Sequence, residues 1–78
     1  MSRKHPTRIT RGINLIDCIQ IVRQHGCEVE PIHRSGEIRF SHPLMPRPEK
    51  EDARRKDTSR AVTTWINKLL GLLRSTAA

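Results

Sequence analysis

The order of hydrophobic periods along the chain is the feature that most constrains the fold. Residues 14–25 carry apolar residues at helical spacing, and Gly26 suits the left-handed residue that often closes a helix. Residues 27–32 and 37–42 alternate apolar and polar side chains around a short glycine-containing turn, which predicts a β-hairpin. A second helical period covers residues 59–73. The pattern therefore places strands between two amphipathic helices.

The first helix is expected to bury a stripe centred on Ile16, Ile19 and Val22, which Leu15 and Cys18 widen. In the second strand, Ile38 and Phe40 are expected to point inward, and His42 is in phase with them at the strand end. These side chains would form one wall of the core.

The second helix is expected to begin after an N-cap at Thr58 or Asp57, because both residue types accept backbone hydrogen bonds at that position. Gly71 lowers helix propensity and is expected to end the helix early. The predicted apolar stripe of this helix comprises Val62, Trp65, Ile66, Leu69 and Leu73. Trp65, the only tryptophan, is expected to anchor the core against the sheet.

Three prolines separate the hairpin from the second helix, at positions 43, 46 and 48. Because proline cannot donate to a β-ladder, a third strand at residues 47–52 must be short or lie on an edge. The predicted fold class is therefore α+β: a small antiparallel sheet of two or three strands packed by two helices, in the order α-β-β-(β)-α. Residues 12–74 form one domain, between a flexible basic arm at 1–11 and a tail at 75–78.

Charge favours a polyanionic partner. The 78 residues include 15 Lys and Arg and 8 Asp and Glu, for a net charge of +7. An excess of this size on a small surface favours nucleic acid first and an anionic membrane second. No apolar stretch is long enough to span a bilayer and no signal peptide is visible, so we expect a cytoplasmic protein without a membrane partner.

Neither a metal site nor a cofactor site is expected. The closest ligand pair is His25 and Cys27, which lie across the predicted helix end. Cys18 and Cys27 are most simply free thiols. The scattered glycines form no phosphate-binding loop.

Basic residues cluster at the start of the second helix. Arg54, Arg55 and Lys56 precede it and Arg60 lies in its first turn. A helix N-terminus offers free backbone N–H groups and a partial positive charge, so the cluster is expected to bind an external anion such as phosphate.

Acidic residues beside the cluster are expected to neutralise part of it, namely Glu49, Glu51 and Asp52. Arg34 and Arg39 of the hairpin are further candidates for nucleic-acid contacts. Both large aromatic side chains occupy core positions, so no platform remains on which splayed bases could stack. Recognition of the backbone and shape of a duplex fits this composition better.

The order α-β-β-β-α, with a basic cluster at the last helix, resembles the double-stranded RNA-binding domain. Over residues 13–73 the chain more closely resembles the HicA-type toxins of bacterial toxin–antitoxin pairs, which are small mRNA-cleaving proteins of that fold. The stretch SGEIRFSHP at 35–43 resembles the G-S-H-x-I-F-x-H-P strand of that family, and LIDCIQIVRQHGCEV resembles its first helix and strand.

The resemblance implies an RNA partner and, in the toxin reading, a metal-independent ribonuclease paired with an acidic antitoxin-like protein. Phe40, His42 and Pro43 match the motif, whereas the catalytic histidine position of the family falls at Glu37. A nuclease would then depend on His42, with Glu37 or His33 assisting. Because glutamate is a poor substitute for a histidine acid–base, weak or absent nuclease activity is expected. A protein-interaction module that binds an acidic partner is a third reading.

Overall fold

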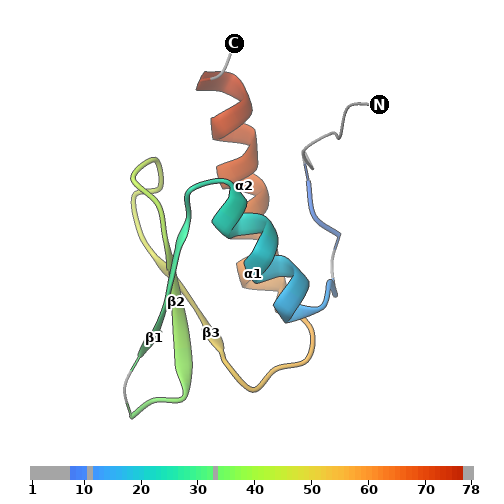
Figure 1. Cartoon of the computed structure of the whole chain (residues 1–78). Helices are drawn as coiled ribbons and strands as arrows, with labels where there is room; N and C mark the ends of the chain where they lie inside the picture. Colours follow the sequence, from blue (N-terminus) through green and yellow to red (C-terminus); the bar gives the residue numbers. More distant parts are fainter. Residues whose placement is uncertain (1–7, 11, 33, 77–78) are drawn as a thin grey trace.

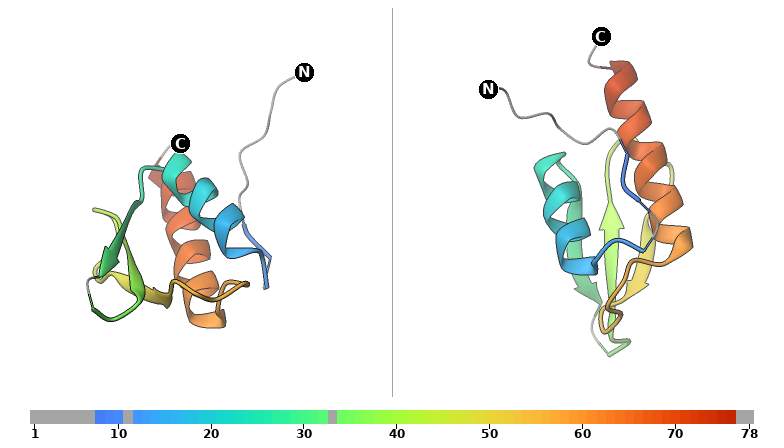
Figure 2. Two further views of the ribbon diagram at one scale, coloured as in Figure 1. Left: turned by 60° about the horizontal axis from the view of Figure 1, so that its bottom comes forward. Right: turned by 90° about the vertical axis from the view of Figure 1, so that its right-hand side faces the viewer.

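The computed structural model describes residues 8–10, 12–32 and 34–76. Three strands form one antiparallel sheet in the order β1-β2-β3, and the two helices lie against the same face of it (Figures 1 and 2). The elements follow one another as α1 (Leu15–Gln24), β1 (Glu28–Ile32), β2 (Glu37–Ser41), β3 (Glu49–Asp52) and α2 (Arg60–Thr76). The predicted α+β class is confirmed, and the third strand is real, short and on an edge of the sheet.

Strand register decides which side chains face the helices. Val29 of β1 lies opposite Phe40 of β2, and Ile38 of β2 lies opposite Glu51 of β3. Phe40 is fully buried, so the residues in phase with it form the inner face. The alternate positions form the outer face, where charged side chains predominate: Glu28, Glu30, Glu37, Arg39, Lys50 and Asp52.

The buried face of α1 is shifted from the predicted one. Leu15, Cys18 and Val22 are buried, whereas the Ile16 side chain is 67% exposed. Adjacent isoleucine and leucine allow two apolar stripes about 100° apart on a helix, and local pattern cannot choose between them. Docking against the sheet and α2 selects the Leu15 stripe. The Oδ1 of Asn14 caps the helix by accepting the backbone N–H of Ile16 at 2.9 Å.

The predicted N-cap of α2 is wrong by one residue. Ser59 caps the helix, because its hydroxyl oxygen accepts the backbone N–H of Val62 at 3.3 Å. Thr58 is instead buried, and its backbone N–H donates to the carbonyl of Ile13 at 2.8 Å. Asp57 forms an isolated β-bridge with Asn14. The loop before α2 therefore pairs through its backbone with the residues just before α1 and fixes the start of that helix.

The predicted early end of α2 at Gly71 is also wrong, since the helix continues to Thr76. A glycine inside a helix costs about 1 kcal/mol relative to alanine. Leu72 and Leu73 immediately after it are partly buried against the core cluster, and full burial of a leucine side chain contributes about 1.5–3 kcal/mol. Packing therefore outweighs the local preference.

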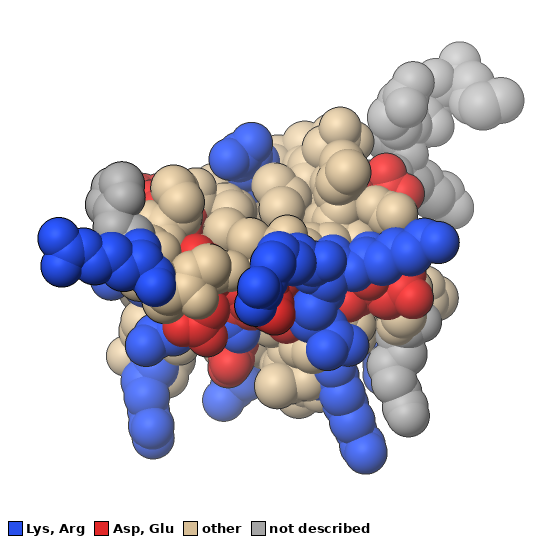
Figure 3. Space-filling view, turned by 90° about the horizontal axis from the view of Figure 1, so that it is seen from below, with Lys and Arg blue, Asp and Glu red and all other residues tan. Residues whose placement is uncertain are grey.

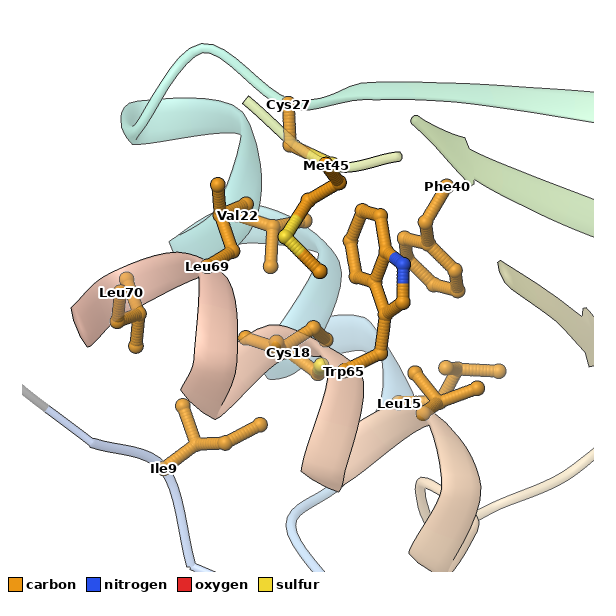
Figure 4. Close-up of a cluster of buried hydrophobic side chains, with 12 residues drawn as sticks. Ile9, Leu15, Cys18, Val22, Cys27, Phe40, Met45, Trp65, Leu69 and Leu70 are labelled. Carbon is orange, nitrogen blue, oxygen red and sulfur yellow. The ribbon is translucent and has the colours of Figure 1, made fainter. Parts of the chain in front are cut away.

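Trp65 anchors the core as predicted. Its side chain is 8% exposed, and its indole N–H donates to the carbonyl of Arg47 at 2.8 Å. In Figure 4 the indole lies between Phe40 of the sheet and Met45 of the loop before β3. This single side chain joins α2 to the strand layer and to the proline-rich loop.

The segment at residues 8–10 packs on the domain. Ile9 is 4% exposed and belongs to the core cluster. Its backbone N–H donates to Oδ1 of Asn67 at 2.7 Å, and its carbonyl accepts from Nδ2 of Asn67 at 3.1 Å. The sequence places residues 8–10 in the flexible basic arm. The other residues of that arm, 1–7 and 11, lie outside the described residues. Within the described chain, neither helix has the length and apolar character to cross a membrane.

Candidate nucleic-acid interface

The turn of the hairpin and the loop after β3 meet at one end of the molecule. The backbone N–H of Ala53 donates to the carbonyl of Gly36 at 2.9 Å, so the two segments are directly joined. Arg34 and Gly36 both adopt positive φ angles, 72° and 71°, which closes the turn tightly. The fold thereby brings Arg34 to the same end as the basic cluster.

We call this end the basic end and define it by Arg34, Arg54, Arg55, Lys56 and Arg60, all of which are exposed. Figure 3 views the molecule from this end. Lys and Arg side chains extend outward around it, with Asp and Glu between them. The sequence-predicted candidates other than Arg39 are therefore at this end, but its surface is mixed in charge.

Arg54 is held back against the end of β3. Its Nε and Nη2 donate to the two carboxylate oxygens of Asp52 at 3.2 and 3.3 Å, and its backbone N–H donates to the same side chain at 2.9 Å. The hydrogen bonds from Arg54 lower the pKa of Asp52. The positive charge of Arg54 is thus offset by the negative charge of Asp52, as the sequence predicts.

A carboxylate of the protein itself occupies the start of α2. Glu51 is 5% exposed, and its Oε2 accepts the backbone N–H of Ser59 at 2.7 Å. Its Oε1 lies 3.6 Å from Nε of Arg55, which also donates to the carbonyl of Asp57 at 3.1 Å. Glu51 and the Ser59 hydroxyl thus accept the backbone N–H groups of Ser59 and Val62 at this terminus, so an external anion would meet a carboxylate of the protein beside it.

Three cations of the basic end differ from Arg54 and Arg55 in their surroundings. Among the described residues, no carboxylate lies within 4.0 Å of Arg34, Lys56 or Arg60. The backbone of Lys56 is nevertheless fixed, since its carbonyl accepts the N–H of Leu15 at 2.9 Å. These three side chains combine exposure, positive charge and an anchored backbone.

Arg39 lies apart from this group on the outer face of the sheet. It is opposite Lys50 on one side and Glu30 on the other, and its Nη2 contacts the Glu30 carboxylate at 3.4 Å.

The residues proposed for catalysis are not brought together. Glu37 begins β2 and His42 directly follows the strand, about 17 Å away along an extended chain, and their odd spacing points them to opposite faces. Nδ1 of His42 accepts the backbone N–H of Leu44 at 3.0 Å, so the neutral ring carries its hydrogen on Nε2, beside Gly26. In that tautomer the ring presents a donor at Nε2, whereas a general base needs an acceptor there. His33 lies outside the described residues.

The two cysteines are free and buried. Burial raises the pKa of the Cys18 thiol and raises that of Cys27 to about 11, which disfavours the reactive thiolate. Within the described chain, no group of three or more His, Cys, Asp or Glu side chains could hold a metal ion. Both cysteine side chains are therefore packing residues of the hydrophobic core.

The sequence predicts Arg8 only as part of a basic arm that is disordered or lies along a phosphate backbone, and it does not predict the groove that Arg8 lines. Arg8, Ile9 and Thr10 face Arg60 and neighbouring residues of α2 across a groove of about 520 Å³. The available signal was Ile9, the one aliphatic residue among the first eleven apart from Met1. Its burial fixes the position of the adjacent arginine.

Known proteins give no match: no family model fits the chain, and no curated protein and no solved structure matches it. The α-β-β-β-α order of this small fold is consistent with the topology of double-stranded RNA-binding domains.

Proposed function

We propose that this protein binds nucleic acid, RNA in preference to DNA, through contacts of the basic end with backbone phosphates. The observation that carries the proposal is a set of three exposed cations, Arg34, Lys56 and Arg60, at one end of a chain of charge +7. None of the three has a carboxylate partner among the described residues. Arginine and lysine on a fixed backbone are suited to phosphate contacts, which set affinity and position.

Arg54 and Arg55 have a secondary role in this proposal. Their ion pairs with Asp52 and Glu51 hold them in place and reduce their free charge. The Arg54–Asp52 pair is exposed and contributes little energy, so a phosphate can compete for that guanidinium group, whereas Arg55 is paired with the buried Glu51. Arg39 is expected to contribute least, because Glu30 already contacts it.

The absence of stacking groups supports recognition of backbone and shape. Phe40 is fully buried and Trp65 nearly so, and the chain has no other Phe, Trp or Tyr. A reader of single-stranded bases would need exposed aromatic rings. The likeness in topology to double-stranded RNA-binding domains favours a duplex RNA over other ligands.

The ribonuclease reading, which the resemblance to HicA-type toxins raised, has less support. Its two candidate groups, Glu37 and His42, cannot reach one phosphate from opposite ends and faces of β2. We therefore expect binding of RNA without efficient cleavage.

The test is fluorescence anisotropy with a labelled RNA duplex, the matching DNA duplex and a single-stranded RNA between 50 and 200 mM salt. Lys56→Ala and Arg60→Ala should each weaken binding to all sequences and reduce the salt slope of log K by roughly one. Arg23→Ala, which removes an exposed cation from α1, is the matched control. Absence of binding to every nucleic acid at the lowest salt would overturn the proposal and leave an acidic protein as the partner to seek.

A further inference from the structure

A groove separates the segment at residues 8–10 from the first half of α2. Figure 2 shows this segment running beside the helix. The groove measures about 520 Å³, and its polar lining includes Arg8, Thr10, Arg60, Thr64 and Asn67. Through Arg60 it adjoins the basic end.

The two walls of the groove are fixed to each other. Asn67 of α2 makes two hydrogen bonds to the backbone of Ile9, as its Oδ1 accepts at 2.7 Å and its Nδ2 donates at 3.1 Å. The buried Ile9 side chain adds core contacts to this clamp. Arg8 and Thr10 flank the clamped residue, so the groove exists before any ligand arrives and binding needs little ordering of the backbone.

The lining has the chemistry of a phosphate site. Among the described residues, neither Arg8 nor Arg60 has a carboxylate within 4.0 Å, and α2 contains no Asp or Glu. Thr10 and Thr64 are exposed and can donate from their hydroxyl groups. No aromatic residue lines the groove, which leaves no platform for a base.

We propose that this groove binds a phosphate group of the nucleic-acid backbone, with Arg8 and Arg60 as the charged contacts and the threonine hydroxyls as further donors. The inference rests on the proposed function for the identity of the ligand and adds a second contact surface to the basic end. Asn67 acts as a positioning residue, because it holds Arg8 opposite Arg60 without needing to contact the phosphate.

Arg8→Gln tests the groove in the full chain. Loss of one charge-assisted contact should weaken binding to the RNA duplex about tenfold and reduce the salt slope of log K by roughly one. Arg23→Gln is the matched control, since Arg23 is an exposed arginine of α1 that does not line the groove, and we expect less than about a twofold change.

Asn67→Ala separates positioning from general stability. With both hydrogen bonds to Ile9 removed, the variant should show the same reduced salt slope as Arg8→Gln. The double variant should be no weaker than the weaker of the two single variants, because Arg8 then has no fixed position left to lose. A merely destabilising change would leave the salt slope of the folded fraction intact.

The outcomes distinguish the groove from the basic end. If the wild type binds RNA and Arg8→Gln has unchanged affinity and salt slope, the groove is overturned while the proposed function stands. If the wild type binds no nucleic acid, a titration with inorganic phosphate followed by NMR decides. Shifts of the Thr10 and Thr64 amides that Arg8→Gln abolishes would retain the groove as a phosphate site without the proposed function. No shifts would overturn both.

Discussion

The outer face of the sheet and the exposed side of α2 are both solvated surfaces of a strongly basic chain, yet their charges differ in kind. On the sheet, carboxylates outnumber cations: Glu28, Glu30, Glu37 and Asp52 surround Arg39 and Lys50. Along α2 there are Arg60, Lys68 and Arg74 and no acidic residue. The net charge of +7 is therefore unevenly distributed.

The difference indicates how each surface is used. Opposite charges on neighbouring strands, such as Glu30 and Arg39, stabilise the sheet by cross-strand pairing and keep it solvated. A helix with cations alone gains no such internal pairing, and its long-range field attracts polyanions. A nucleic acid is thus expected to approach from α2, the loop before it and the segment at residues 8–10, and to avoid the outer sheet.

The largest expected effect concerns the core that keeps these two surfaces back to back. Trp65→Ala should lower the free energy of unfolding by about 3–5 kcal/mol, because it removes a buried ring between α2 and the sheet. Urea denaturation followed by circular dichroism measures the loss. Trp65→Phe retains an aromatic ring and loses the hydrogen bond to Arg47, so a smaller loss is expected. Equal stability of Trp65→Ala and wild type would show that the two layers are held by other contacts.

The second effect tests the comparison directly by charge reversal. Lys56→Glu with Arg60→Glu should weaken binding to duplex RNA about 100-fold, since two phosphate contacts become repulsive. Arg39→Glu with Lys50→Glu changes the same net charge on the outer sheet and should cost less than about tenfold. Anisotropy titrations at one fixed salt concentration compare the pairs. If the two losses were equal, net charge alone would set affinity and the surfaces would be equivalent.

The sequence was sufficient to predict the elements that depend on residues close to one another in the chain. Helical and alternating periods located both helices and the hairpin, and proline chemistry placed the third strand on an edge. The choice of Leu15 over Ile16 as a buried residue was beyond local pattern, because either stripe is apolar and only the packed sheet distinguishes them.

The features of the candidate site that the sequence did not predict depend on contacts between residues far apart in the chain. Ser59, and not Thr58, caps α2, because the backbone of Thr58 is hydrogen-bonded to Ile13, the residue two positions before α1. Glu51 reaches the N-terminus of α2 only because β3 ends beside it, and Arg8 faces Arg60 only because Asn67 holds Ile9. Clustering of like charge in sequence identified the basic end, but the internal partners of each cation depend on tertiary contacts.

A third, smaller effect concerns the carboxylate at the start of α2. Glu51→Ala should lower the free energy of unfolding by about 2 kcal/mol, because the backbone N–H of Ser59 loses its acceptor and the helix loses an anion at its positive end. Glu49→Ala on the same strand is the control, since Glu49 is in no ion pair among the described residues. Denaturant midpoints that move equally in the two variants would contradict the capping role of Glu51.

The smallest expected effect is the pH dependence of the Asp52–Arg54 pair, where the acidic sheet meets the basic end. Hydrogen bonds from Arg54 hold the pKa of Asp52 below its ordinary value of 3.8. A carboxyl with a lowered folded-state pKa binds protons more readily when unfolded, so its stabilising contribution is present above about pH 4. The contribution is then lost as the pH falls through the lower folded value.

Thermal unfolding of the wild type and of Asp52→Asn between pH 2 and 6 measures the contribution of the Asp52–Arg54 pair to stability. The gap in Tm between them should be small, because both side chains are exposed, and it should close as the pH falls below about 4. Arg54→Ala should show the same closing gap, since it removes the hydrogen bonds that lower the pKa. A gap that stays constant across this range would mean that the pair does not form in solution. Arg54 would then be as free as Lys56 to bind phosphate, and the boundary between the two surfaces would move from the loop to the end of β3.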